Sequence, residues 1–303
     1  IHERLVGSEM CIRDSLYKVK LNNDSESHKL QCYAIWLPDA LEGNEAEKLF
    51  FESAEYLKSE CNRLGIELIG IGEFLGNAFS KHRNSAFFTV ENGKALNGKI
   101  ENVKRFAELG VRIMTLTWND NNEIGSGVLS KDKCGLTDFG KLAISEMEKY
   151  GNVIDISHAS DELFYDVANQ TNKPFIATHS NSRTVTRNPR NLTDEQIKII
   201  ISRGGIIGLN LHNAFLNNNP DKACTEDILR HCEYMLSLGC ENFLCFGTDF
   251  DGCALPKDIV GSDSIGGIYE LFLKNNYNES ILKKIFYENA YKFFENFDNQ
   301  RIM

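Results

Sequence analysis

Short apolar runs alternate along the chain with longer segments in which apolar residues recur every three or four positions. Several of the short runs are apolar on both faces and rich in β-branched and aromatic residues, which is typical of strands buried in a parallel sheet. They predict strands over residues 30–37, 66–71, 86–91, 111–118, 153–158, 174–179, 205–210 and 242–249. The longer segments predict helices over residues 44–64, 100–109, 137–150, 160–170, 193–202, 225–238 and 279–297.

The alternation of strands and helices indicates βα units around a parallel sheet, and the number of strands favours a TIM-like (β/α)8 barrel. Residues 66–71 are joined to residues 86–91 by a segment with only a weak helical period, so they can be an accessory strand beside the barrel. In that case the strands number one short of eight, and the missing strand is the first. We therefore expect an α/β barrel whose first strand is lacking or replaced.

The composition is that of an ordinary globular protein. The chain has 303 residues, of which 42% are hydrophobic and 25% charged, enough for one large domain. Its formal net charge of −10 argues against a nucleic-acid partner, because no basic stripe is present to contact phosphates. No apolar stretch reaches the roughly 20 residues of a membrane span, and the first residues lack a signal-peptide core.

The nine cysteines indicate whether the chain belongs to an oxidising or a reducing compartment. No two of them stand in a C-x-x-C spacing, so neither a disulfide framework nor a zinc–thiolate site is expected. Cys32 and Cys245 lie inside apolar runs, where a free cysteine behaves as a small buried hydrophobe. We expect a reducing, cytoplasmic setting.

Candidate chemistry gathers at the ends of the predicted strands, which in a parallel barrel meet at one mouth. The run FFTVE ends at Glu91, VIDISH at His158 and FIATHS leads to His179, while LCFGTDFDG contains Asp249 and Asp251. A single histidine at a strand end is usually a structural residue, but groups of this kind at four strand ends are harder to dismiss. Imidazole nitrogen and carboxylate oxygen are zinc ligands. The sequence therefore predicts a metal site at the mouth of the barrel.

The ordered motifs E-N-G, I-S-H, T-H-S, R-N-L-T-D and D-F-D-G closely resemble those of the membrane (renal) dipeptidase family, from about residue 30 to the C-terminus. Members of this family are zinc-dependent barrels with two metal ions bridged by a carboxylate. The resemblance implies hydrolysis of the peptide bond of dipeptides by a metal-activated water. Dimers are common among relatives, so a homodimer is a further expectation.

The resemblance also implies roles for single residues. Glu91 matches the bridging glutamate, and His158 and His179 match the two histidines of the second metal ion. Asp249 matches the aspartate that handles the proton of the attacking water. Arg190, in PRNLTD, matches the arginine that clamps the free carboxylate of the dipeptide. A planar guanidinium suits that task because it can meet both carboxylate oxygens.

One departure from the family concerns the first metal ion. Family members end their first strand with an H-x-D pair that holds this ion, but neither His2 nor His28 is followed two positions later by aspartate. Residues 1–15 resemble nothing in the family, and we expect them to be a non-native segment that replaced the true first strand. The barrel domain would then cover residues 16–303, with one Zn²⁺ possible in place of two.

A second departure is Trp118, which stands where many members have a histidine after T-L-T. Tryptophan can line the substrate pocket with its ring and indole N–H, but it cannot supply an imidazolium.

Two alternatives to a working dipeptidase stay open. One is a catalytically impaired or truncated metal-binding paralogue of the same fold, and the other is a barrel amidohydrolase acting on a different amide or lactone. Arg190 speaks against the latter, because such substrates rarely carry a free α-carboxylate.

Overall fold

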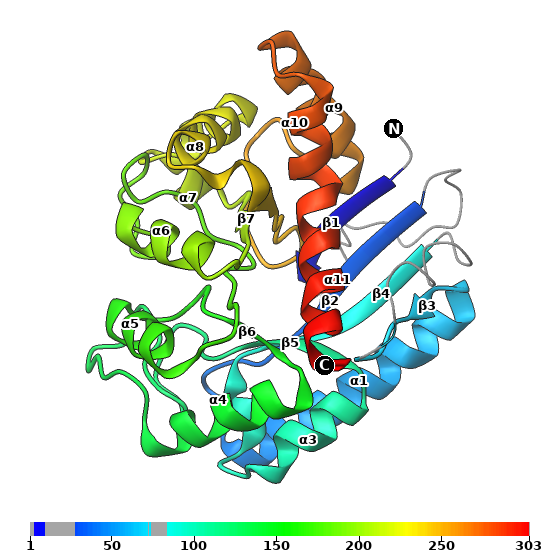
Figure 1. Cartoon of the computed structure of the whole chain (residues 1–303), viewed down its shortest axis with the longest axis vertical. Coiled ribbons are helices and arrows are strands. Elements are labelled where there is room, and N and C mark those ends of the chain that lie inside the picture. The colour runs from blue at the N-terminus through cyan, green and yellow to red at the C-terminus, as the bar shows by residue number, and fades with distance from the viewer. Residues whose placement is uncertain (1–2, 10–27, 72, 74–83, 303) are drawn as a thin grey trace.

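Parallel strands form the centre of the molecule, and helices cover the outside of the sheet (Figure 1). The computed structural model describes residues 3–9, 28–71, 73 and 84–302. One sheet contains, in spatial order, β1 (Glu3–Glu9), β2 (His28–Trp36), β4 (Asn84–Glu91), β5 (Val111–Thr115) and β6 (Val153–Asp155). A second sheet pairs β7 (Ile207–Leu209) with β8 (Leu244–Phe246).

Two parallel bridges connect these sheets. Ile176 bridges to Asp155 at the end of β6, and Ala177 bridges to Ile207 at the start of β7. β8 in turn lies beside β1. The eight strand segments therefore follow one another in the order of a TIM-like α/β barrel, although no ladder joins β8 to β1 within the described residues.

In place of the predicted strand 174–179, the structure has only the two bridges at Ile176 and Ala177. Hydrogen bonds to a nearby side chain explain why. The backbone N–H of Thr178 donates to Oδ1 of Asp155 at 2.9 Å, and the N–H of Ser157 donates to the same oxygen at 3.1 Å. Both amides thus leave the backbone ladder to bind one buried carboxylate. The regular strands end where this side chain takes over the hydrogen bonding.

The position of the first strand is occupied. β1 pairs in parallel with β2 along its whole length, from Glu3 opposite His28 to Glu9 opposite Ala34. The expectation of a lacking strand is therefore wrong, and the alternative of a replaced one agrees with the sequence of β1, ERLVGSE, which has no H-x-D pair. The rest of the expected foreign segment, residues 1–2 and 10–15, lies outside the described residues. β3 (Glu67–Leu68) pairs only with β4, off the main strand order, as expected of an accessory strand.

The helices are α1 (Gly43–Leu64), α3 (Glu101–Glu108), α4 (Asp138–Tyr150), α5 (Asp161–Gln170), α6 (Asp194–Ser202), α7 (Asn213–Leu216), α8 (Thr225–Ser237), α9 (Ile265–Lys274), α10 (Glu279–Lys283) and α11 (Asn289–Ile302). Six of the seven predicted helices match one helix of the structure each, the seventh is divided into α10 and α11, and α7 and α9 were not predicted. Several of the predicted starts are strongly encoded. Thr137, Ser160 and Thr193 each accept a backbone N–H of the following first turn through their side-chain oxygens. Within the described residues, every helix is too short or too polar to traverse a lipid bilayer.

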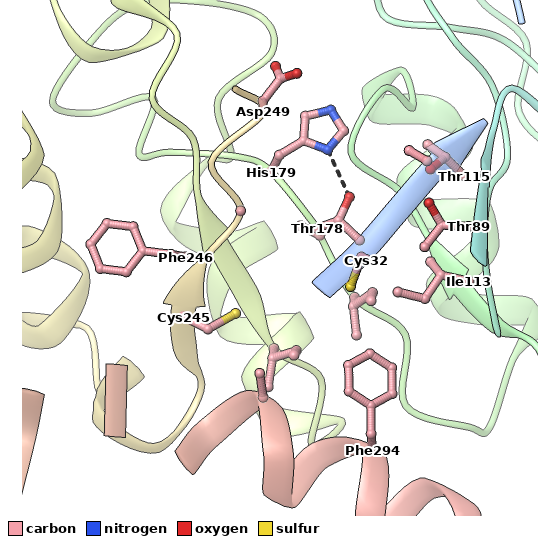
Figure 2. Close-up of a pocket in the computed structure, with 16 residues that line it drawn as sticks. Cys32, Thr89, Ile113, Thr115, Thr178, His179, Cys245, Phe246, Asp249 and Phe294 are labelled. Atoms are coloured by element: carbon pink, nitrogen blue, oxygen red, sulfur yellow. Dashed lines mark hydrogen bonds between the residues drawn. The ribbon is translucent and has the colours of Figure 1, made fainter. Parts of the chain in front are cut away.

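Helix α11 closes the end of the barrel opposite the strand carboxyl ends. Its Phe293 and Phe294 pack in one buried cluster with residues from the strands, among them Leu30 and Phe87. Between these phenylalanines and the carboxyl ends of the strands, a cavity of about 60 Å³ remains inside the barrel. Figure 2 shows Phe294 entering this cavity from α11, with His179 at the far side. One end of the barrel is thus sealed, and the other carries the polar strand ends.

Candidate metal centre

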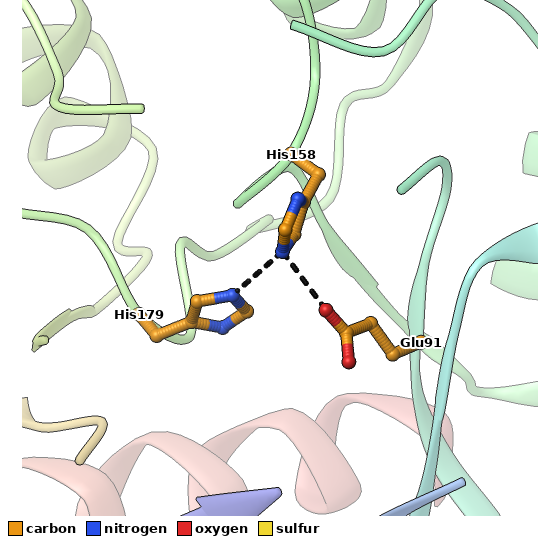
Figure 3. Close-up of side chains that lie close together, drawn as sticks. All are labelled: Glu91, His158 and His179. Carbon is orange, nitrogen blue, oxygen red and sulfur yellow. Dashed lines mark hydrogen bonds and ion pairs between the residues drawn. The ribbon is translucent and has the colours of Figure 1, made fainter. Parts of the chain in front are cut away.

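Three of the predicted ligands converge at the carboxyl ends of the strands (Figure 3). Glu91 is the last residue of β4, His158 follows β6, and His179 follows the bridging segment. Nε2 of His158 lies 2.8 Å from Oε1 of Glu91 and 3.0 Å from Nε2 of His179. One ligand atom from each of the three residues lies within 4.8 Å of the others, and all three side chains are buried.

The surroundings favour neutral imidazoles with Nε2 directed to the centre of this cluster. Burial, helped by the positive charge of Arg190, lowers the pKa of His179 to about 4. Burial likewise holds the pKa of His158 well below its usual value. Nδ1 of His158 lies 3.2 Å from Oδ1 of Asn119, an oxygen that can only accept, so this nitrogen carries the proton.

This donor set fits a divalent metal ion. Near pH 7 neither histidine holds a second proton, so two imidazole nitrogens and a carboxylate oxygen converge on one point. Neutral imidazole and carboxylate are the ligands that zinc takes in proteins. Glu91, His158 and His179 would hold the ion.

A cavity of about 600 Å³ opens above the cluster. Besides Glu91 and His158, its lining includes the other three residues predicted for catalysis or substrate binding, Asp249, Arg190 and Trp118. Since His179 contacts His158 directly, all six predicted site residues lie at one mouth.

Arg190 and Asp249 supply opposite charges to this cavity. Arg190 is only 6% exposed, and its guanidinium lies 5.3 Å above the ring of Phe215. Asp249 has a φ of 56°, a left-handed conformation that is uncommon outside glycine, asparagine and aspartate. Its Oδ2 accepts a hydrogen bond of 3.2 Å from Nδ2 of Asn210.

Aromatic side chains form another wall. The ring of Trp118 lies 4.9 Å from that of Trp36, edge to face, and 6.2 Å from the ring of His158. Trp118 therefore lines the pocket as a large apolar surface beside the ligands. His212, for which the sequence left a pocket role open, also lines the cavity and packs 4.4 Å from the ring of Phe215.

Comparison with known proteins agrees with this site. A family model described as membrane dipeptidase, peptidase family M19, matches residues 18–301. The chain belongs to the membrane dipeptidase family. β1 ends at Glu9, before the matched region begins.

Two curated relatives show how far the similarity extends. An uncharacterized protein in the pqqA 5′ region of Klebsiella pneumoniae is 31% identical over 217 residues, covering 68% of this chain and 80% of that protein. Mouse Dipeptidase 3 is 24% identical over 279 residues, covering 89% of this chain and 56% of that protein. Family membership therefore rests on most of the chain.

Solved structures support the fold. A dipeptidase described as a metallopeptidase of family M19 is 25% identical, with a TM-score of 0.82 over 88% of this chain and 85% of its own. A metallopeptidase from Rhodobacter sphaeroides, liganded with a phosphinate mimic of the dipeptide L-Ala-D-Ala, is 24% identical, with a TM-score of 0.81 over 88% of this chain and 86% of its own. The M19 dipeptidase among these structures is described as a metallopeptidase, and Glu91, His158 and His179 are placed so that they could hold a metal ion.

Sequence reasoning missed several residues of the site. Asn119 follows a predicted strand end directly and could have been found by the same rule that found His158. Trp36 lies near the end of a predicted strand but was not distinguished from other apolar residues. Asn210 ends a predicted strand, yet its role depends on the neighbouring Asp249, which only the fold places beside it.

Proposed function

We propose that this chain is a zinc-dependent dipeptidase with one metal ion held by Glu91, His158 and His179. The observation that carries the proposal is the convergence of these three ligands beneath a cavity whose wall presents a buried arginine. A positive charge beside a hydrolytic metal site suits a small substrate with a free carboxylate. Dipeptides have that chemistry, and the relatives are named for it.

Zinc bound at this cluster would acidify a water molecule and polarise the scissile carbonyl. Asp249 lies in the same cavity, where its carboxylate can take a proton from the attacking water and pass it to the leaving amine. The hydrogen bond from Asn210 to Oδ2 holds this carboxylate in place. Asp249 is therefore our candidate for the general base and acid.

Arg190 is our candidate for the substrate clamp. Its buried, planar guanidinium can meet both oxygens of a carboxylate, and the ring of Phe215 supports it from one side. Trp118 and Trp36 would exclude water from the side of the cavity next to the ligands. The substrate would then lie between the arginine and the metal site.

The test compares a dipeptide with its C-terminal amide, which lacks the charged carboxylate. Loss of two charge-assisted hydrogen bonds corresponds to about 3–4 kcal/mol, so Arg190→Met should lower kcat/KM for the dipeptide by roughly 10²- to 10³-fold. The same substitution should change the slow hydrolysis of the amide little. Arg187→Met, which removes an exposed arginine three positions away, is the matched control. Equal losses on both substrates, or no loss on the dipeptide, would exclude the clamp.

A catalytically impaired metal-binding chain is the second candidate, because β1 has neither histidine nor aspartate to hold a second metal ion. Replacing the end of β1 by an H-x-D pair distinguishes the two. If the unchanged chain binds zinc without hydrolysing dipeptides and the replacement restores hydrolysis, the second candidate is correct.

A reducing cytoplasmic setting and a homodimer remain proposals. The eight cysteines of the described residues are all free, which is the state that a reducing compartment maintains.

A further inference from the structure

A fully buried carboxylate lies directly beneath the metal cluster. Asp155, the last residue of β6, has 0% exposure and accepts five hydrogen bonds. Its Oδ1 accepts from the N–H and hydroxyl of Ser157 and from the N–H of Thr178. Its Oδ2 accepts from the hydroxyls of Thr115 and Thr178, each at 2.6 Å. Donors from three adjacent strand ends thus meet on one side chain.

These hydrogen bonds determine which ring nitrogen of His179 carries the proton. The hydroxyl of Thr178 donates its proton to Oδ2 of Asp155 at 2.6 Å, because a carboxylate oxygen can only accept and is a stronger acceptor than an imidazole nitrogen. Oγ1 of Thr178 also lies 2.8 Å from Nδ1 of His179 (Figure 2). With its own proton committed, this oxygen can only accept here, so Nδ1 of His179 is the donor. Nε2 is then left with its lone pair directed to His158 and Glu91.

We propose that Asp155 is a positioning residue that acts through the Thr178 hydroxyl to hold His179 in the tautomer and orientation needed to bind metal at Nε2. This inference rests on the proposed metal site, because it gives Nε2 a ligand's role. A histidine ligand is commonly oriented by an acceptor at its other nitrogen, and loss of that acceptor weakens metal binding.

The backbone around Thr178 is held tightly enough for this task. A Cβ atom at Gly247 would lie 1.7 Å from the carbonyl oxygen of Thr178, and one at Gly208 would lie 1.9 Å from it. Two neighbouring strands therefore pack against this carbonyl with no room for a side chain. The N–H of His179 also donates to Oγ of Ser157 at 3.1 Å, which ties the histidine backbone to the same network.

The test uses two substitutions that remove equivalent donors. Thr178→Val and Thr115→Val each delete a hydroxyl that donates to Oδ2 of Asp155 at 2.6 Å, but only Thr178 also contacts His179. Zinc affinity is measured by competition with a chelator. Thr178→Val should weaken it roughly 10- to 100-fold, whereas Thr115→Val should leave it close to that of the unchanged chain. Equal affinities in the two variants, whether reduced or not, would overturn the proposal.

A second readout needs no metal. ¹⁵N NMR of the histidine rings in the metal-free protein should show the proton of His179 on Nδ1 in the unchanged chain and in Thr115→Val. In Thr178→Val the Nε2-protonated form should appear. Protonation at Nε2 in the unchanged chain would overturn the inference. If the unchanged chain bound no zinc but the tautomers behaved as expected, the proposed function would fail and the orientation of His179 through the Thr178 hydroxyl would stand.

Discussion

His231 provides a test of the buried polar network that holds the loop of Arg190. This histidine of α8 has 0% exposure, and its Nδ1 accepts a hydrogen bond of 3.2 Å from the N–H of Ser182. Its Nε2 lies 3.2 Å from both the carbonyl oxygen of Leu216 and Oγ1 of Thr186. Protonating Nδ1 would break the bond to Ser182, at the start of the loop that ends in Arg190.

The size of the effect follows from the pKa of His231. Burial is the main cause that lowers this pKa from 6.5 to about 4; Arg230 acts in the same direction, while the hydrogen bond to the carbonyl of Leu216 and the charge of Asp227 oppose the shift. Between these values the unfolded chain binds a proton that the folded chain does not, so stability falls as pH falls. Linkage between the two pKa values removes about 2 kcal/mol of the free energy of unfolding between about pH 7 and about pH 5.

The assay is urea unfolding of the metal-free protein at both pH values. His231→Gln removes the titration, so the variant should lose about 2 kcal/mol less than the unchanged chain on acidification. Thr186→Val is the control, because it deletes a partner of His231 but keeps the imidazole. It should be less stable at both pH values with the full pH dependence. If His231→Gln showed the same pH dependence as the unchanged chain, the account of a neutral buried histidine would be refuted.

Two further predictions concern a buried ion pair and the proposed proton-transfer group, Asp249. Arg112 of β5 and Asp298 of α11 form an ion pair in which the side chains are 3% and 4% exposed. Arg112→Met would leave the carboxylate of Asp298 buried without its partner, so it should lower the free energy of unfolding in urea by about 3–5 kcal/mol. The double variant Arg112→Met/Asp298→Leu should be more stable than the single one; a less stable double variant would contradict this. Asp249→Asn should lower kcat by roughly 10²- to 10⁴-fold with little change in zinc affinity, and an unchanged kcat would remove Asp249 from the chemistry.

The convergence of the three proposed metal ligands could be predicted because their placement depends on topology alone. Once strands and helices alternate, the strand ends of a parallel barrel meet at one mouth, so Glu91, His158 and His179 could be grouped without knowing any distance. The starts of three helices could also be predicted from the sequence, because Thr137, Ser160 and Thr193 cap them through contacts within the next three residues.

The network beneath the metal cluster could not be predicted. Asp155, Thr115 and Thr178 sit in or beside predicted strands as ordinary polar residues, and their hydrogen bonds span 23 and 40 positions of the chain. Only the strand order brings them together. β1 was missed for a different reason. Its sequence carries no strand pattern of the family, and it pairs through backbone groups that any sequence can offer along the edge of β2.

The most direct test of the central claim is the zinc content of the folded chain after incubation with excess Zn²⁺ and desalting. We predict one zinc ion per chain, and loss of that ion in both His158→Ala and His179→Ala while the variants remain folded by circular dichroism. Absence of zinc from the unchanged chain, or its retention in both variants, would contradict a metal centre built from Glu91, His158 and His179.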